Sequence, residues 1–353
     1  MVTRVRRLFV SLLVVGCTDG SSDVGHGGAA GATTADARDA DALPPIVVTT
    51  DETELAPGDE LVGVCQTFSL GNVDPIFVRA VTFEASPGVH HSDWSSYDED
   101  AVNGPDGSAD CMTFEGFGVT TDSSKHAFLF SQSTQSTRET QDFGDGAALR
   151  IPPHSKLLVS YHLQNPTADR LKTRLTASLQ PARPEEVTTR LVAGGGLIGI
   201  LAVPPLSRSR FHADCTFDGP PSFKTYFMLP HYHQRGRGMR LELLGGSRDG
   251  EVVWQNEGTI GEALGARIAP AVDVTGSTGF RFTCLYDNTT TETLACGASP
   301  SQEMCSFFVH TDAPRQFYGV AAPAFGPTSI RDEGTNAAGE RVFAVDGCQM
   351  LLP

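Results

Sequence analysis

Two histidines separated by one residue, His231 and His233, have the spacing of a metal site built on a β-strand. Alternate side chains of a strand project from the same face, so both imidazoles can reach one ion. The pair directly follows a predicted strand over 223–229. The same spacing also occurs on solvated strands, so further ligands are needed to define a site.

A second pair, His90 and His91, is adjacent in the sequence. Neighbouring residues of an ideal strand point to opposite faces, so this pair can bind one ion only at a strand end or a bulge. The turn residues Ser86-Pro87-Gly88 directly before it supply such a distortion. Taken alone, the pair is interpreted as incidental. His162 lies on another predicted strand, 156–163.

Met304 is the third feature with possible chemistry. A thioether is a soft ligand that favours Cu(I) and does little for Zn(II). If its segment continues as a strand, Met304 and Cys305 face opposite ways, so Cys305 can enter a disulfide while Met304 reaches into a cleft. Taken alone, Met304 would be interpreted as a core residue.

The other five histidines are isolated in the sequence: His26, His126, His154, His212 and His310. His310 lies six residues after Met304, which is roughly 20 Å along a strand, so we do not expect it to share an ion with Met304. His126, His154 and His212 are interpreted as surface or core residues. Tyr232 and Arg235, beside the His-x-His pair, are interpreted as structural or as supporting the ligands.

The composition indicates the elements that must position these side chains. The chain has 353 residues, 37 Gly and 22 Pro, which suits short strands and turns better than long helices. Apolar residues alternate with polar ones over 171–179 and 239–243. Further strands are predicted over 76–84, 126–131, 251–255, 279–285 and 305–310. We therefore expect an all-β fold of antiparallel, jelly-roll-like β-sandwiches.

The charge balance narrows the possible partners. With 42 Asp+Glu against 26 Lys+Arg, the formal net charge is −16. Nucleic acid binding needs a basic surface, so we expect no nucleic acid partner. Pro181-Ala182-Arg183-Pro184 interrupts the strand pattern near the middle. It predicts a boundary between an N-terminal domain, 47–185, and a C-terminal domain, 186–353.

The first 17 residues have the pattern of an export signal. Arg4, Arg6 and Arg7 precede a short apolar run, as in a signal peptide. The run ends in Val-Val-Gly-Cys, which resembles a bacterial lipobox whose Cys17 is acylated. An ordinary signal peptide cut nearby is the alternative. Residues 18–46 have the composition of a flexible tether. We expect an exported protein of the bacterial envelope, held at the membrane only by its lipid.

Cysteine usage agrees with export, because disulfides form outside the cytosol. The chain has 8 Cys, so seven remain if Cys17 carries lipid, and one of the seven is left over. They are Cys65, Cys111, Cys215, Cys284, Cys296, Cys305 and Cys348. None lies in a Cys-x-x-Cys motif, so most are expected to be structural disulfides.

In order and spacing, these residues resemble the copper type II, ascorbate-dependent monooxygenases, the family of dopamine β-hydroxylase and peptidylglycine hydroxylating enzymes. That family holds one copper with a His-His pair and a later His, and a second with His-x-His and Met. The resemblance covers about 47–353 and implies two coppers per chain, each site facing a cleft. One is held by His90, His91 and His162, and the other by His231, His233 and Met304.

The resemblance also implies the disulfide pairs Cys65–Cys111, Cys215–Cys348 and Cys284–Cys305, leaving Cys296 unassigned. Two departures matter. Ser92 follows the His-His pair where the family usually has Met. Leu229, Ser306 and Phe308 stand where peptide-amidating members use Arg, Asn and Tyr to hold a carboxylate. Peptide amidation is therefore not expected, and a smaller or more apolar substrate is favoured.

The implied function is copper-dependent hydroxylation of a C–H bond in a small organic substrate, using O2 and a one-electron donor such as ascorbate. The all-histidine site would supply an electron, while His231, His233 and Met304 would form the catalytic copper site. A non-catalytic envelope copper-binding lipoprotein is the main alternative. A zinc hydrolase is disfavoured by Met304, and an adhesive β-sandwich by the ordered spacing.

Overall fold

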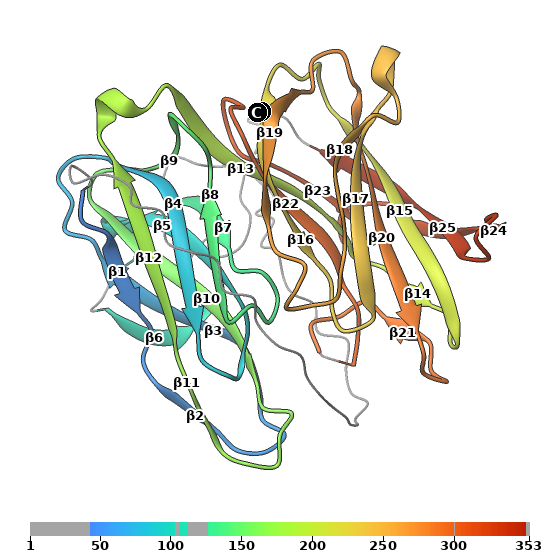
Figure 1. Cartoon of the computed structure of the whole chain (residues 1–353), viewed down its shortest axis with the longest axis horizontal. Helices are drawn as coiled ribbons and strands as arrows, with labels where there is room; N and C mark the ends of the chain where they lie inside the picture. The colour runs from blue at the N-terminus through green and yellow to red at the C-terminus, as the bar shows by residue number, and fades with distance from the viewer. Residues whose placement is uncertain (1–42, 103–105, 112–125, 300, 351–353) are drawn as a thin grey trace, which may run out of the picture.

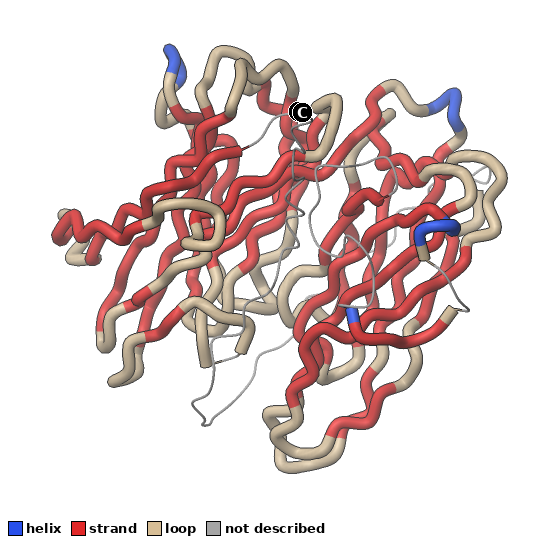
Figure 2. The backbone as a smooth tube through the Cα atoms, turned by 180° about the vertical axis from the view of Figure 1, so that it is seen from behind, coloured by secondary structure: helices blue, strands red, loops and turns tan. Residues whose placement is uncertain are grey.

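The computed structural model describes residues 43–102, 106–111, 126–299 and 301–350. The expected signal peptide, Cys17 and nearly all of the tether lie outside the described residues. Within them the chain is built from β-strands and short turns, as Figures 1 and 2 show from opposite sides, and no α-helix occurs in these ranges. None of these residues forms a helix long and apolar enough to cross a membrane.

Twelve strands precede residue 185: β1 Ile46–Thr49, β2 Thr53–Leu55, β3 Glu60–Ser69, β4 Ile76–Ala85, β5 Val89–Asp98, β6 Gly107–Asp110, β7 His126–Ser131, β8 Arg138–Asp142, β9 Ala147–Ile151, β10 Ser155–Gln164, β11 Leu171–Thr173 and β12 Leu175–Ala182. The predicted alternation is present, because Leu175, Ala177 and Leu179 are buried on one face of β12. The expected strand 171–179 is divided at Arg174, where β11 pairs with β2 and β12 pairs with β1 and β4.

Two sheets of this half enclose a common core. The first has the order β6-β3-β10-β5-β7, and the second includes β1-β12-β4-β9 with β8 beside β4. Phe83 of β4, Trp94 of β5 and Val159 of β10 are fully buried in one hydrophobic cluster. Side chains of both sheets therefore share one interior, which is the arrangement of a β-sandwich.

Thirteen strands follow: β13 Thr189–Ile198, β14 Ala202–Val203, β15 Ser207–Phe217, β16 Lys224–His231, β17 Gly236–Leu244, β18 Val252–Glu257, β19 Ala266–Asp273, β20 Gly279–Asn288, β21 Leu294–Ala295, β22 Cys305–Thr311, β23 Phe317–Ala321, β24 Ser329–Thr335 and β25 Arg341–Met350. A second core lies among them. Phe282 of β20 packs on Phe307 of β22, with ring centroids 4.9 Å apart.

Most ladders are antiparallel, as expected, but three are parallel: β13 with β9, β13 with β23, and β15 with β25. Parallel neighbours need a crossover connection, which turn signals in the sequence do not reveal. β13 lies between the two halves in Figure 1 and continues the hydrogen bonding of β9 into β22 and β23. The expected domain boundary falls just before it, in the turn Pro184–Glu186.

Three disulfides join Cys65 to Cys111, Cys215 to Cys348 and Cys284 to Cys305. These are the pairs that the family resemblance implies. Cys296 forms no disulfide with another described residue, and its thiol donates to the Ile198 carbonyl oxygen at 3.6 Å. Three disulfides are compatible with an exported protein.

Candidate metal centre

The adjacent histidines lie on a β-bulge. β5 and β10 are paired with His91 opposite His162, but the next matched pair is Val89 opposite Leu163, so His90 is an extra residue on β5. An extra residue breaks strict alternation, which lets neighbouring side chains turn toward the same side. One nitrogen from each of His90, His91 and His162 lies within 4.8 Å of the others. The distortion expected before the pair is therefore present, at the pair itself.

Hydrogen bonds to polar neighbours bear on which ring nitrogen of His162 and of His90 keeps a lone pair for a metal ion. His162 Nε2 lies 2.9 Å from Glu60 Oε1. A carboxylate accepts, so the proton is on Nε2 and the buried Nδ1, which has no hydrogen-bond partner among the described residues, keeps its lone pair. The Gln164 amide nitrogen donates to His90 Nδ1 at 3.1 Å. If the Gln164 amide is flipped, its oxygen accepts from His90 Nδ1–H. The lone pair that can bind a metal is then on His90 Nε2.

The His-x-His pair is positioned differently from the sequence expectation. β16 ends at His231, so strand alternation does not extend to His233. Glu303 holds His233 instead, because its carboxylate accepts from the backbone N–H groups of His233 at 3.0 Å and Arg235 at 2.6 Å. His233 Nδ1 donates to the Gln302 carbonyl oxygen at 3.1 Å. The lone pair is therefore on Nε2, which is buried and unpartnered among the described residues.

Met304 lies directly between Glu303 and the first residue of β22. Its side chain is half-buried, and its carbonyl oxygen accepts from the Tyr286 hydroxyl at 2.6 Å. Cys305, the next residue, is fully buried in its disulfide with Cys284. Glu303 and Cys305 thus anchor the main chain on both sides of Met304, beside the turn that carries His233.

The two expected ligand sets meet in one cluster. The ring centroids of His90 and His233 are 5.0 Å apart, and those of His91 and His231 are 4.7 Å apart. Within each set the centroids lie between 4.7 and 5.5 Å apart, so the spacing across the sets is no larger. We expected two sites facing a cleft. The structure places the rings of the bulge in β5 directly against those at the end of β16, so the two ligand sets adjoin each other.

Burial keeps His90, His91, His231 and His233 neutral. It lowers the pKa of His231 to about 3 and that of His233 to about 4, and charge repulsion from neighbouring imidazoles adds to both shifts. Burial and the other rings also hold the pKa of His90 and His91 well below the usual range. Neutral imidazoles are the form that binds metal. Unpartnered buried nitrogens on His90, His91, His162 and His233 therefore fit metal ions such as copper.

Leu229, Ser306 and Phe308 stand where the resemblance places the residues that hold a peptide carboxylate. All three are uncharged here and pack against other side chains. Leu229 of β16 is paired with Phe308 of β22. The Phe308 ring stacks on Phe128, with centroids 5.0 Å apart. Ser306 is buried, and its hydroxyl lies 3.2 Å from the Tyr318 hydroxyl. None of these side chains carries a positive charge that could hold a carboxylate.

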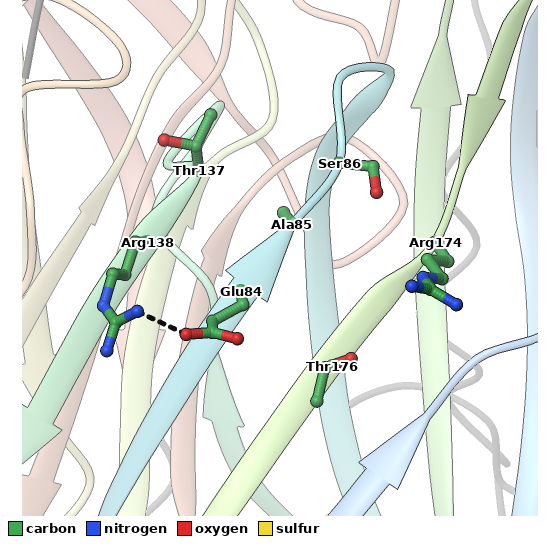
Figure 3. Close-up of a pocket in the computed structure, with 7 residues that line it drawn as sticks. All are labelled: Glu84, Ala85, Ser86, Thr137, Arg138, Arg174 and Thr176. Carbon is green, nitrogen blue, oxygen red and sulfur yellow. Dashed lines mark hydrogen bonds and ion pairs between the residues drawn. The ribbon is translucent and has the colours of Figure 1, made fainter.

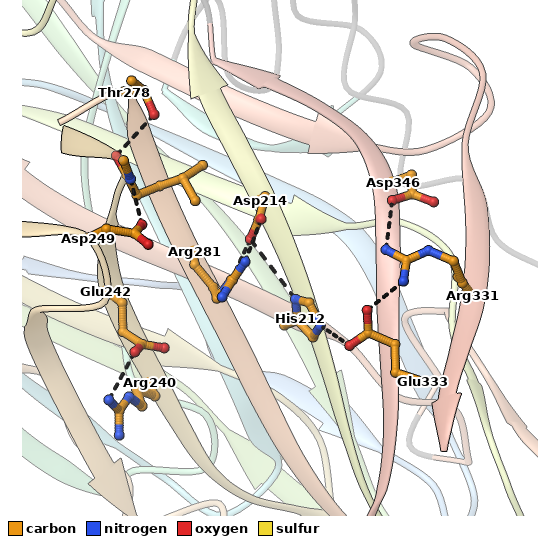
Figure 4. A network of polar contacts seen from close by, with 12 residues as sticks. His212, Asp214, Arg240, Glu242, Asp249, Thr278, Arg281, Arg331, Glu333 and Asp346 are labelled. Atoms are coloured by element: carbon orange, nitrogen blue, oxygen red, sulfur yellow. Dashed lines mark hydrogen bonds and ion pairs between the residues drawn. The ribbon is translucent and has the colours of Figure 1, made fainter. Parts of the chain in front are cut away.

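The remaining histidines lie elsewhere. His310 Nε2 donates to the Leu129 carbonyl oxygen at 2.7 Å, and its ring packs on Phe143 and Phe227. His126 packs on Tyr97. His212 belongs to the network in Figure 4, 3.0 Å from Glu333, on strands that carry no cluster histidine. His154 lies in a turn and His26 outside the described residues.

A surface hollow of about 300 Å³ lies at the ends of β4, β8 and β12 (Figure 3). Glu84 and Arg138 form an ion pair along one side, and Arg174 lies on the other. Its remaining lining residues are Ala85, Ser86, Thr137 and Thr176. The hollow contains no histidine, so it is not part of the candidate metal centre.

Glu60, Gln164 and Glu303 are supporting residues that the sequence interpretation missed. Gln164 lies two residues after His162, and Glu303 directly before Met304, so strand spacing and adjacency could have indicated both. Glu60 is 102 residues from His162, and only the pairing of β3 with β10 brings them together.

Comparisons add little to this description. The sequence matches no protein-family profile and no curated protein. Among solved structures, infectious bursal disease virus VP2 subviral particles match with 10% identity over 77% of this chain and 73% of that one, with a TM-score of 0.21. A T=1 Penaeus vannamei nodavirus particle matches with 11% identity, 73% and 98% coverage and a TM-score of 0.18. Likenesses this weak carry no argument about fold or function.

Proposed function

We propose that this protein is a copper-dependent monooxygenase that hydroxylates a C–H bond of a small, largely apolar substrate. The observation that carries the proposal is the cluster of five packed histidines from three separate segments, the bulge in β5, strand β10 and the end of β16. Four of these histidines have a buried ring nitrogen with no hydrogen-bond partner among the described residues. His90, His91 and His162 would hold one copper, and His231, His233 and Met304 the other. Bound copper supplies one-electron storage and O2 activation.

The overall reaction balances with a separate reductant. Substrate R–H, O2, two electrons and two protons give R–OH and one water. Ascorbate or another one-electron donor would supply the electrons one at a time, which suits two metal sites. The chain's own part is to orient His162 through Glu60 and His233 through Gln302. Burial keeps the other rings and His233 neutral.

The side chains beside His231 on β16 and β22 indicate the class of substrate. Leu229 and Phe308 form a cross-strand pair that continues the β16–β22 ladder from His231. An apolar neighbourhood without a cationic clamp favours an apolar substrate over a peptide carboxylate. The net charge of −16 argues against nucleic acid as a partner.

Location is part of the proposal. Residues 1–17 would direct export, Cys17 would carry the lipid, and residues 18–46 would tether the folded part to the bacterial envelope. The three disulfides support an oxidising compartment. The lipid would be the only contact with the membrane.

Copper counting tests the proposal. The detergent-solubilised chain should retain two coppers after reduction and desalting, and a His231→Ala/His233→Ala variant should retain one. With ¹⁸O₂ and ascorbate, apolar substrates should gain one ¹⁸O atom. Retention of zinc in place of copper would contradict the proposal. Two coppers with no O2 consumption would favour the non-catalytic copper-binding lipoprotein, which the closely packed rings also suit.

A further inference from the structure

One loop of the first half contacts both histidine sets. Residues 132–137 connect β7 to β8, and we call them the bridging loop. Although it is a connection, the loop is largely inside the protein: Gln132, Ser133, Thr134 and Ser136 are all buried. Connecting segments usually run over the surface, so a buried loop needs partners for its polar groups.

Those partners include the second half of the chain. Thr134 Oγ1 lies 3.0 Å from His231 Nδ1. The Thr134 carbonyl oxygen accepts from Gly261 N–H at 2.8 Å. Ser133 Oγ accepts from Gly265 N–H at 3.1 Å. Two consecutive residues therefore connect the loop to His231 and to the segment between β18 and β19.

The same loop also contacts the bulge. Gln135 N–H donates to the His90 carbonyl oxygen at 2.6 Å, and its side-chain amide lies 3.5 Å from His90 Nδ1. Gln135 has a φ of 56°, a left-handed conformation that a non-glycine residue adopts when its surroundings impose it. The loop's own contacts do so: the Gln132 amide donates to the Ser136 carbonyl oxygen at 2.6 Å, and Ser133 N–H donates to Glu139 at 2.8 Å.

An imidazole in a metal site offers one nitrogen, and the hydrogen bond at the other nitrogen decides which. For His231, that neighbour is Thr134. A hydroxyl oxygen can accept from Nδ1–H, which leaves the Nε2 lone pair for a metal. Without an acceptor, the ring is free to place its proton on either nitrogen and to rotate.

We propose that Thr134 is a positioning residue for the second copper site. Its hydroxyl presents Nε2 of His231, while the neighbouring Gln135 N–H binds the His90 carbonyl oxygen, so adjacent residues of one loop contact both ligand sets. This inference rests on the proposed function only for the identity of the metal, since the geometry of the loop is independent of the reaction.

Copper binding without turnover provides the test. Competition titration of the detergent-solubilised chain against a Cu(I) chelator measures both sites, and His231→Ala identifies the step that belongs to the second. Thr134→Val keeps the shape and removes the hydroxyl. We expect it to weaken the second step by roughly 10- to 100-fold and to leave the first within about twofold. The Cu(II) EPR spectrum of the second site should change as well.

Two matched variants control the measurement. Thr134→Ser restores the acceptor and should restore affinity and spectrum. Ser136→Ala alters the same buried loop but keeps the Ser136 main-chain carbonyl, which accepts from the Gln132 amide. It should leave both copper-binding steps unchanged. Unchanged binding in Thr134→Val, or an equal loss at both sites, would overturn the inference. Normal Thr134 effects in a protein that never hydroxylates would refute the monooxygenase proposal alone, and a chain that binds no copper would refute both.

Discussion

At the scale of single residues, hydrogen bonds at one ring nitrogen orient the histidines of the candidate metal centre, most clearly His162 and His233. Glu60 fixes the proton of His162, and the Gln302 carbonyl fixes that of His233. The other nitrogen of each ring is buried without a hydrogen-bond partner among the described residues, and burial lowers the pKa of His233 to about 4. The Met304 side chain has no such hydrogen bond among the described residues, and its proposed role depends on the soft-ligand character of its thioether sulfur.

Met304 gives the sharpest residue-level test. Met304→Leu keeps the apolar volume but removes the thioether, so it should remove the soft ligand without creating a large cavity. We expect hydroxylation to fall by at least about 100-fold, beyond what loss of a supporting hydrogen bond produces. Met239→Leu, the same change in the core of the second half, is the control and should retain activity. Equal activity of both variants would show that Met304 is a packing residue.

Glu303 tests the support of His233. Glu303 accepts from two backbone N–H groups, those of His233 and Arg235. Glu303→Gln keeps an oxygen for one of them and turns an NH2 group toward the other. Leaving a buried donor unsatisfied costs about 1–3 kcal/mol, so urea unfolding should show a loss of that size. Copper bound at the second site should fall while the first site remains filled. If copper is lost equally from both sites, Glu303 supports the whole fold and not His233 in particular.

At the scale of elements, two local irregularities create the ligand geometry. The bulge in β5 turns both His90 and His91 inward, and the end of β16 at His231 releases the chain so that Glu303 can hold the next turn. Gly236 closes that turn against the Tyr232 ring, where a Cβ would come within 2.1 Å of a ring carbon. In a regular strand His90 and His91 would point to opposite faces.

Gly88 lies directly before the bulged strand β5, and its substitution tests how this element forms. Its φ is +98°, and an added Cβ would lie 3.2 Å from Leu55 Cδ1 and 3.3 Å from Thr173 Cβ. Gly88→Ala should therefore destabilise the fold by about 1–3 kcal/mol and weaken copper binding at His90 and His91. Gly58→Ala, at φ +80° in open space, measures the backbone cost alone. A Gly88 variant with unchanged first-site affinity would show that the bulge forms without this turn.

At the scale of the whole molecule, the centre exists only because the two halves pack together. His310 of β22 donates to the Leu129 carbonyl oxygen of β7. Gln316 bonds both main-chain groups of Phe128, with its amide donating at 2.7 Å. Phe227 and Leu229 of β16 join the core of the first half. These contacts lie along the same interface as the histidine cluster.

His310 makes this interface sensitive to pH. Burial lowers its pKa to about 4, and the bond to Leu129 offsets only part of that shift. Between pH 6.5 and 4 the unfolded chain binds a proton that the folded protein excludes, so stability falls as pH falls. His310→Gln keeps a donor for Leu129 but does not titrate. Its unfolding free energy should depend less on pH in this window, by up to about 1.4 kcal/mol per pH unit. Parallel curves for variant and parent would contradict this.

Much of the local structure follows from the sequence. The alternation over 175–179 predicts a half-buried strand, and β12 is one. Binding of one ion by His90 and His91 is expected only at a strand end or a bulge, and β5 has a bulge at this pair. Parallel pairing of β13 with β9 and of β15 with β25 could not be predicted, because local patterns record which face is buried and not which strand lies beside it.

Residue types and order alone indicate which side chains are candidate metal ligands, because chemistry and strand periodicity are local properties. The all-β class and the disulfide pairs are predictable in the same way or through resemblance. Only the tertiary structure decides that the two ligand sets touch, that Glu60 reaches His162 and that Thr134 reaches His231. Those contacts join residues 97 to 143 positions apart, and the packing of two cores selects them.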